Sequence, residues 1–166
     1  MSTIKLPRES NALRIPRRRV PVRIELTDGS PLTGALYADR TTASGAPGRV
    51  VDRLNDVAEP FVPLAVEDRH ILLRKSSVLL VRMIDEPEAS LPSGASQTKL
   101  RLCLTMASGM TVQGQLRAVL PRQRTRALDF LNLNSDRFLE VRRGDGRLTL
   151  VNSRHIARVI EVLNAD

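Results

Sequence analysis

Hydrophobic and polar residues alternate along two neighbouring stretches of the chain, residues 22–26 and 32–37. A period of two residues is the pattern of a β-strand with one buried face. The segment between them, residues 27–30, contains Asp28-Gly29, which is typical of a tight turn where glycine adopts a positive φ. The pattern therefore predicts a β-hairpin.

The same pattern returns in the second half of the chain. Gly29 and Gly34 align with Gly109 and Gly114 at a constant offset of 80 residues, and alternate apolar positions align with them. Three blocks recurring in the same order indicate a tandem duplication. The other two blocks align residues 51–61 with 128–138 and residues 73–81 with 151–159.

Each copy contains three further predicted elements. The apolar spacing predicts one or two helical turns, followed by a third strand and a closing hairpin. In the first copy these are residues 50–58, 61–66 and 71–84, and in the second copy residues 127–132, 138–141 and 148–162.

The chain is therefore expected to be mainly β. Five short antiparallel strands per repeat, bent at Gly34 and Gly114, are typical of a small SH3-like barrel. We expect two tandem small β-barrels, each with a short helical turn inserted before the third strand. The predicted segments are a basic, flexible N-terminal arm (residues 1–19), a first β-barrel repeat (20–85), a Pro/Gly/Ser-rich linker (86–98) and a second β-barrel repeat (99–163).

The two repeats resemble the Sm/LSm family. Residues 24–29, Gly34-Ala-Leu36 and Asp39 are similar to that family's first motif, and residues 150–159 are similar to its closing hairpin. The resemblance implies a Sm-like small barrel in each repeat. The positions with which that family contacts RNA hold other residue types here, so the resemblance implies the fold rather than RNA binding.

A second resemblance concerns the N-terminal arginines. Arg19 and Arg23 have the Arg-x-x-x-Arg spacing with which PilZ domains bind a cyclic dinucleotide, and residues 28–30 are similar to the start of that family's second motif. However, Gly34 falls one place too far along, and only four residues separate Arg23 from Asp28. A cyclic-dinucleotide sensor is therefore the third-ranked alternative.

Positive charge is concentrated in two places. The chain has 26 basic and 18 acidic residues, a net charge of +8. Basic clusters attract polyanions, but aromatic residues make up only 2%, so surfaces for base stacking are scarce. The predicted polyanion-binding residues are Arg14, Arg17, Arg18, Arg19, Arg23, Arg117, Arg122, Arg124 and Arg126.

Three pairs of residues recur between the copies and invite a structural or chemical role. Asp52 and Asp129 form a carboxylate pair suited to acid–base work or a hard cation, but helix capping is the favoured interpretation. Two further pairs are assigned to structure. Asn55 and Asn132 are predicted to close turns by hydrogen bonds, and Phe61 and Phe138 to fill the core of each barrel.

The sequence offers little for catalysis. His70 and His155 do not occupy matched positions in the repeats, and Cys103 lies on an alternating strand. We therefore expect no catalytic residue, metal or cofactor.

These observations favour a non-catalytic interaction module that docks on a protein partner or assembles with itself. The alternative is an RNA-binding protein that uses the basic arm and the loop at Arg117–Arg126. No stretch reaches the ~18 apolar residues of a membrane-spanning helix, and a single cysteine cannot form an internal disulfide. A cytoplasmic location is therefore expected.

Overall fold

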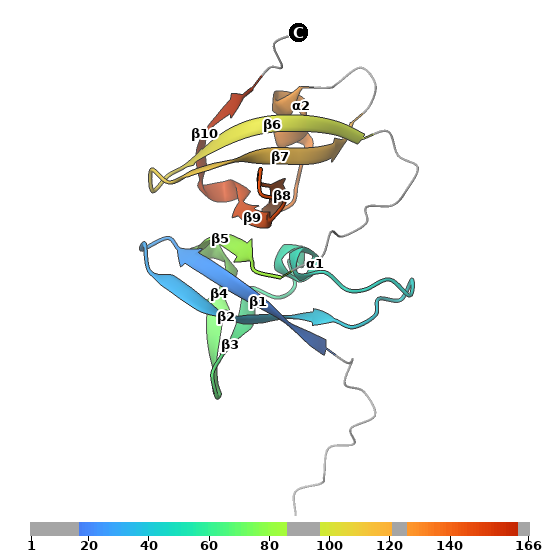
Figure 1. Ribbon diagram of the computed structural model, residues 1–166, viewed down its shortest axis with the longest axis vertical. Coiled ribbons are helices and arrows are strands. Elements are labelled where there is room, and N and C mark those ends of the chain that lie inside the picture. Colours follow the sequence, from blue (N-terminus) through green and yellow to red (C-terminus); the bar gives the residue numbers. More distant parts are fainter. Residues whose placement is uncertain (1–16, 86–96, 121–125, 163–166) are drawn as a thin grey trace, which may run out of the picture.

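The computed structural model describes residues 17–85, 97–120 and 126–162. Arg14, Arg122 and Arg124, three of the predicted polyanion-binding residues, lie outside these ranges. Within them the chain forms ten antiparallel strands and two short α-helices, so the prediction of a mainly β protein is confirmed (Figure 1).

The two repeats contain the same elements in the same order. The first consists of β1 (Arg17–Leu26), β2 (Pro31–Asp39), α1 (Val50–Asn55), β3 (Phe61–Val66), β4 (Arg69–Arg74) and β5 (Val78–Met83). The second consists of β6 (Gln97–Met106), β7 (Thr111–Val119), α2 (Ala127–Leu133), β8 (Phe138–Arg142), β9 (Leu148–Asn152) and β10 (Ile156–Glu161). A single 3-10 turn joins the last two strands of each repeat, Lys75–Ser77 in the first and Ser153–His155 in the second.

The boundary of the expected arm differs from the structure. β1 begins at Arg17 and pairs with β2 from that residue onward, with Arg17 opposite Asp39 and Arg19 opposite Tyr37. Arg17, Arg18 and Arg19 therefore belong to a strand, because backbone pairing extends beyond the point where the apolar alternation starts.

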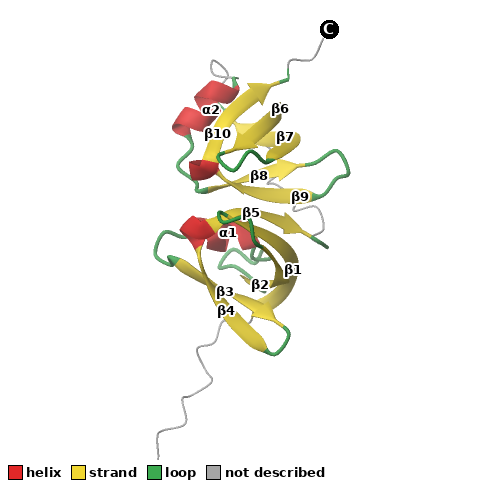
Figure 2. Cartoon of the chain, turned by 90° about the vertical axis from the view of Figure 1, so that its left-hand side faces the viewer, coloured by secondary structure: helices red, strands yellow, loops and turns green. Residues whose placement is uncertain are grey.

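All ten strands belong to one continuous sheet. Its order is β10-β6-β7-β8-β9-β5-β1-β2-β3-β4, so each repeat arranges its own five strands in the same way. The repeats are joined by pairing between β5 and β9, seen where the two halves meet in Figure 2. The sheet is not closed, and β4 and β10 are its edges. Two separate tandem barrels therefore remain an interpretation of the repeats.

Glycine is required where the strands turn or cross closely. Gly29 and Gly109 have φ angles of 84° and 87° in the two hairpin turns, as the sequence predicts. A Cβ atom on Gly34 would lie 2.4 Å from the carbonyl oxygen of Ala65, and one on Gly114 would lie 2.4 Å from that of Arg142. The absence of a side chain at these two glycines therefore lets the second and third strands of each repeat cross closely.

Two clusters of buried apolar side chains form the core. One is centred on β1, β2, α1 and β3, and the other on β6, β7 and β8. Each cluster also takes side chains from the other repeat, because Phe138, Leu148 and Leu150 belong to the first cluster, and Leu79 and Leu80 to the second. The repeats therefore share their cores.

Candidate interaction surfaces at the two ends of the sheet

The inner joint, defined here as the contact of β5 and α1 with β8 and β9, shows how one repeat binds another. In its strand pairing Val81 lies opposite Leu150, flanked by Leu80 opposite Val151. The run of apolar residues over β5 is buried on both faces of the sheet, which is the pattern of an interior strand. The joint is therefore a ladder of backbone hydrogen bonds with apolar side chains on both sides.

A side-chain amide extends this ladder. The carbonyl oxygen of the Asn55 side chain accepts a hydrogen bond from the backbone N–H of Phe138 at 2.7 Å, and the Asn55 side-chain amide donates to the Phe138 backbone carbonyl at 3.1 Å. The two bonds imitate the pairing of one strand residue with another. The prediction that Asn55 closes a local turn is therefore wrong, because its partner lies 83 residues away in the other repeat.

Further polar contacts cross the inner joint. The side-chain amide of Asn152 donates to the backbone carbonyl of Val78 at 2.8 Å, and Nε2 of His155 lies 2.8 Å from the carbonyl oxygen of Ser76. Arg49 forms an ion pair with Glu140. These contacts satisfy polar groups that the joint removes from water.

Lys75 supports the inner joint from within the first repeat. Its side chain is 1% exposed, and its Nζ donates to the carbonyl oxygens of Arg53 and Asp56 at 2.6 and 2.7 Å. It thereby satisfies carbonyls at the C-terminal end of α1, which holds Asn55. Burial lowers the pKa of the Lys75 ammonium below its ordinary value of 10.5, while the charges of Glu59 and Asp56 act in the opposite direction.

The buried roles of Lys75 and Asn152 were not predicted from the sequence. Lysine and asparagine within polar turns normally face water, so neither residue type signalled burial. A signal was present in their neighbours, because residues 78–81 and 148–151 are nearly continuous apolar runs rather than alternating ones. Such runs are typical of strands covered on both faces.

At the outer ends of the sheet, the described counterparts of residues buried at the inner joint are exposed. Phe138 is 1% exposed at the inner joint, whereas its repeat counterpart Phe61 is 48% exposed beside the edge strand β4. The prediction that both phenylalanines fill a core therefore holds for Phe138 and is wrong for Phe61. Instead, the guanidinium carbon of Arg74 lies 5.6 Å from the centre of the Phe61 ring.

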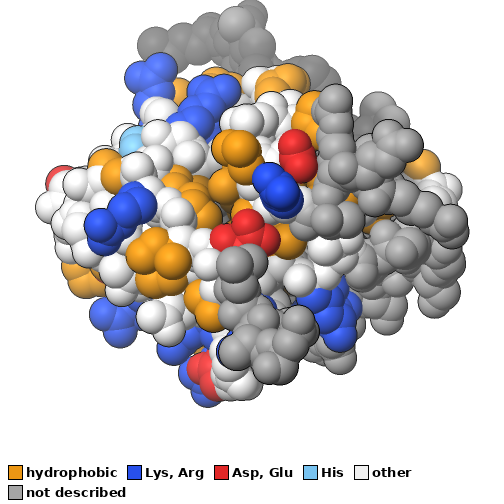
Figure 3. Space-filling view, turned by 90° about the horizontal axis from the view of Figure 1, so that it is seen from above, with side chains coloured by type: hydrophobic (Ala, Val, Ile, Leu, Met, Phe, Trp, Pro, Cys, Tyr) orange, Lys and Arg blue, Asp and Glu red, His pale blue; other side chains and the backbone are white. Residues whose placement is uncertain are grey.

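The end that carries β10 and α2 is also partly apolar. Leu128 on α2 is 65% exposed, whereas its counterpart Val51 on α1 is 6% exposed. Ile160 on β10 is 49% exposed. Seen from above, this end shows apolar side chains between cations (Figure 3). Asn132 on α2 is exposed, and among the described residues its side chain has no hydrogen-bond partner, so the structure provides no support for its predicted turn-closing bond.

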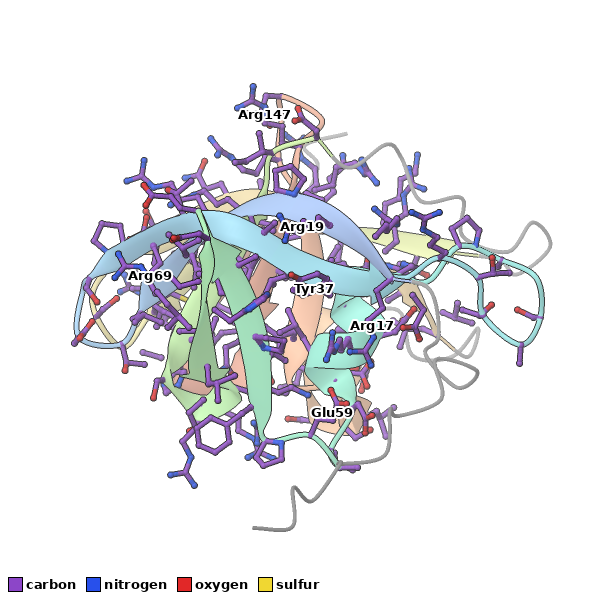
Figure 4. All side chains as sticks on the ribbon, turned by 90° about the horizontal axis from the view of Figure 1, so that it is seen from below. Arg17, Arg19, Tyr37, Glu59, Arg69 and Arg147 are labelled. Atoms are coloured by element: carbon purple, nitrogen blue, oxygen red, sulfur yellow. The ribbon has the colours of Figure 1, made fainter. Side chains whose placement is uncertain are left out.

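The described polyanion-binding candidates are mostly engaged with neighbours. Arg17 and Arg19 lie beside β2, where Arg17 pairs with Asp39 at 3.5 Å and the Arg19 guanidinium stacks on Tyr37 (Figure 4). Arg23 and Arg82 both contact the carboxylate of Glu25, at 3.4 and 2.7 Å. The remaining candidates are dispersed: Arg18 donates to the carbonyl of Gly48, Arg117 lies in β7, and Arg126 is the N-cap residue of α2.

The residues considered for chemistry are also dispersed. Asp52 and Asp129 lie in the first turns of α1 and α2, while the N-cap positions are held by Arg49 and Arg126 without side-chain capping bonds. The predicted capping role is therefore wrong in its detail, because each aspartate lies inside its helix. There it still faces the positive end of the helix dipole.

The histidines and the cysteine do not meet either. His70 contacts the hydroxyl of Tyr37 at 2.7 Å, His155 lies at the inner joint, and Cys103 is a partly exposed residue of β6. Within the described residues, no group of three or more His, Cys, Asp or Glu side chains is arranged to hold a metal ion. No described helix has both the length and the apolar character needed to span a membrane.

Comparisons with known protein families, with curated proteins and with solved structures found no match for this chain. The function of the chain is therefore inferred from the geometry of its two sheet ends.

Proposed function

We propose that this chain is a non-catalytic interaction module that binds protein partners through the open edge strands β4 and β10. The observation that carries the proposal is the inner joint, where an equivalent pair of strands, β9 and β5, already binds one repeat to another. An edge strand presents unpaired N–H and C=O groups that readily accept a further strand.

The side chains beside these edges support the same proposal. Leu72 on β4 is 70% exposed and Ile160 on β10 is 49% exposed. Exposed apolar side chains next to unpaired backbone groups are typical of a surface covered by a partner. Each repeat acts in this proposal as a Sm- or SH3-like small barrel unit, and the unit's edges rather than a pocket make the contact.

The experiment is affinity purification from the native host with wild-type chain and with edge variants, followed by binding measurements with the purified partner. Leu72→Lys and Ile160→Lys place a charge on β4 or β10 and should weaken partner binding at least tenfold. The matched control is Val57→Lys, because Val57 is 96% exposed in the loop after α1, outside both edges.

Two results would contradict the proposal. One is a protein partner whose affinity is unchanged by both edge variants. The other is recovery of RNA instead of protein, with an affinity that falls steeply between low and physiological salt, which would support the polyanion-binding alternative.

A further inference from the structure

The geometry points to a second copy of this chain as the partner at the two open ends, joined head to tail. We infer that Asn132 of one copy holds the backbone of Phe61 in the next copy, as Asn55 holds Phe138 within the chain. This inference rests on the proposed function and specifies its partner.

The first support is positional equivalence between the repeats. Phe61 lies opposite Arg74 in the β3·β4 pairing, and Phe138 lies opposite Asn152 in the β8·β9 pairing, so each phenylalanine begins its strand at the same place in the register. Asn55 and Asn132 occupy matching places in α1 and α2. The amide and its backbone target therefore exist twice, but within the chain only one amide has met its target.

The second support is the strand register. At the inner joint Val81 lies opposite Leu150. The repeat counterparts of these two residues are Val159 on β10 and Leu72 on β4. Transferring the inner register to the outer ends places Val159 of one copy opposite Leu72 of the next. In the same register Ile160 lies opposite Ile71 on one side of this pair, which adds an apolar contact, and Arg158 lies opposite Leu73 on the other side.

The third support is the difference in burial between matched residues. Leu150 is fully buried at the inner joint and its counterpart Leu72 is 70% exposed, a difference that repeats the pattern of Phe138 and Phe61. On the opposing surface, Val51 is 6% exposed and its counterpart Leu128 is 65% exposed. The exposed residues are thus counterparts of residues that are buried at the inner joint, and they occur at both ends of the sheet.

The two surfaces lie at opposite ends of the long axis, with β3 and β4 at one end and β10 and α2 at the other (Figures 1 and 2). Within the described residues the two ends of one chain therefore cannot meet, and a contact between them requires another copy. A contact between two different surfaces is heterologous, so it propagates from copy to copy.

The outer joint lacks some of the contacts of the inner joint. The counterparts of Leu79 and Leu80 are Ala157 and Arg158, which are smaller or charged. Arg49 and Glu140 form an ion pair at the inner joint, but their counterparts are Arg126 and Pro63, which cannot form an ion pair. Association between copies is therefore weaker than the union of repeats within the chain, and it depends on protein concentration.

The first test measures the mass of the full chain by sedimentation and light scattering over a wide concentration range. We expect reversible association that Asn132→Ala weakens about tenfold, since two hydrogen bonds are lost. Leu72→Lys should weaken it further, and Val57→Lys should leave it unchanged. Thermal unfolding of each variant verifies that the fold is retained.

The second test reads the register directly. In a Cys103→Ser background, an equal mixture of Leu72→Cys and Val159→Cys chains should be joined by a short bismaleimide, whereas neither variant alone should crosslink. A chain that stays monomeric at all concentrations, or that associates without crosslinking in this register, overturns the inference. If a host protein binds the edge strands of a monomeric chain, the inference fails while the proposed function stands.

Discussion

The side chain of Asn55 holds both backbone hydrogen-bonding groups of Phe138, with distances of 2.7 and 3.1 Å, across the joint between the two repeats. A single asparagine thus takes the place of a strand residue and fixes α1 to the start of β8. Asn132 has the same identity and the same place in α2, but among the described residues it makes no such contact.

Replacing the two asparagines by alanine should therefore have unequal effects. Asn55→Ala leaves an N–H and a C=O group of Phe138 without partners in a partly buried place, so we expect a loss of about 1–3 kcal/mol in the free energy of unfolding. Asn132→Ala should change that free energy by less than about 0.5 kcal/mol, as exposed substitutions do. Urea unfolding at low protein concentration measures both, and equal losses would contradict the assignment.

Replacing the two phenylalanines by alanine should also have unequal effects on stability. Phe138→Ala removes a ring that is 1% exposed, and about 3–5 kcal/mol of stability should be lost. Phe61→Ala removes a half-exposed ring and should cost about 1 kcal/mol or less in the monomer. A large loss for Phe61→Ala in dilute solution would show that Phe61 fills a core after all.

Lys75→Met should remove a pH dependence as well as two hydrogen bonds. Because burial lowers the Lys75 pKa, there is a window below 10.5 in which the unfolded chain holds the proton and the folded chain does not. Stability rises with pH across that window. We expect the variant to be less stable by about 1–3 kcal/mol at neutral pH. The deficit should grow as the pH approaches 10.5.

The control for this pH series is Lys99→Met, because Lys99 is an exposed lysine of β6. From pH 7 to 10 the stability deficit of Lys75→Met should grow relative to that of this control. If the Lys75→Met deficit shrinks over the same range, the burial of the ammonium does not lower its pKa.

Glycine should be indispensable at the close strand crossings. A Cβ atom at Gly34 or Gly114 would approach a backbone oxygen to 2.4 Å, so alanine at either position requires the strands to separate. We expect each variant to lose about 1–3 kcal/mol or more of stability. Gly144→Ala is the matched control, because no atom lies within 4 Å of the added carbon. Thermal unfolding measures all three.

The repeats should unfold together. Phe138, Leu148 and Leu150 of the second repeat lie in the first core cluster, and Leu79 and Leu80 of the first repeat lie in the second, so neither cluster is complete without the other repeat. Calorimetry should show one transition in which the calorimetric and van't Hoff enthalpies agree. Two resolved transitions would mean that the shared side chains contribute little to either core.

The elements of the fold were predictable because each has a local signal. Residues 61–66 form the predicted strand, residues 50–55 form a helix within the predicted helical segment 50–58, and Gly29 has the predicted positive φ. These features depend on the period of apolar residues and on backbone freedom, both of which are written within a few positions of the sequence.

The joint was not predictable in the same way, because its partners are far apart in the chain. Asn55 and Phe138 are separated by 83 residues, and nothing near either residue specifies the other. The duplication even suggested that Phe61 and Phe138 have the same role. Their different burial arises because one repeat has a neighbour on that side and the other does not.

The pairing of β5 with β9 also means that any assembly of this chain contains an even number of repeats. Each chain already contains one joint between repeats, so if copies join head to tail as proposed, a closed ring of n chains would have n-fold rotational symmetry and 2n repeats. Covalently tethered and untethered joints then alternate around it. Dilution would then break only the joints between chains and release single chains, each with two joined repeats.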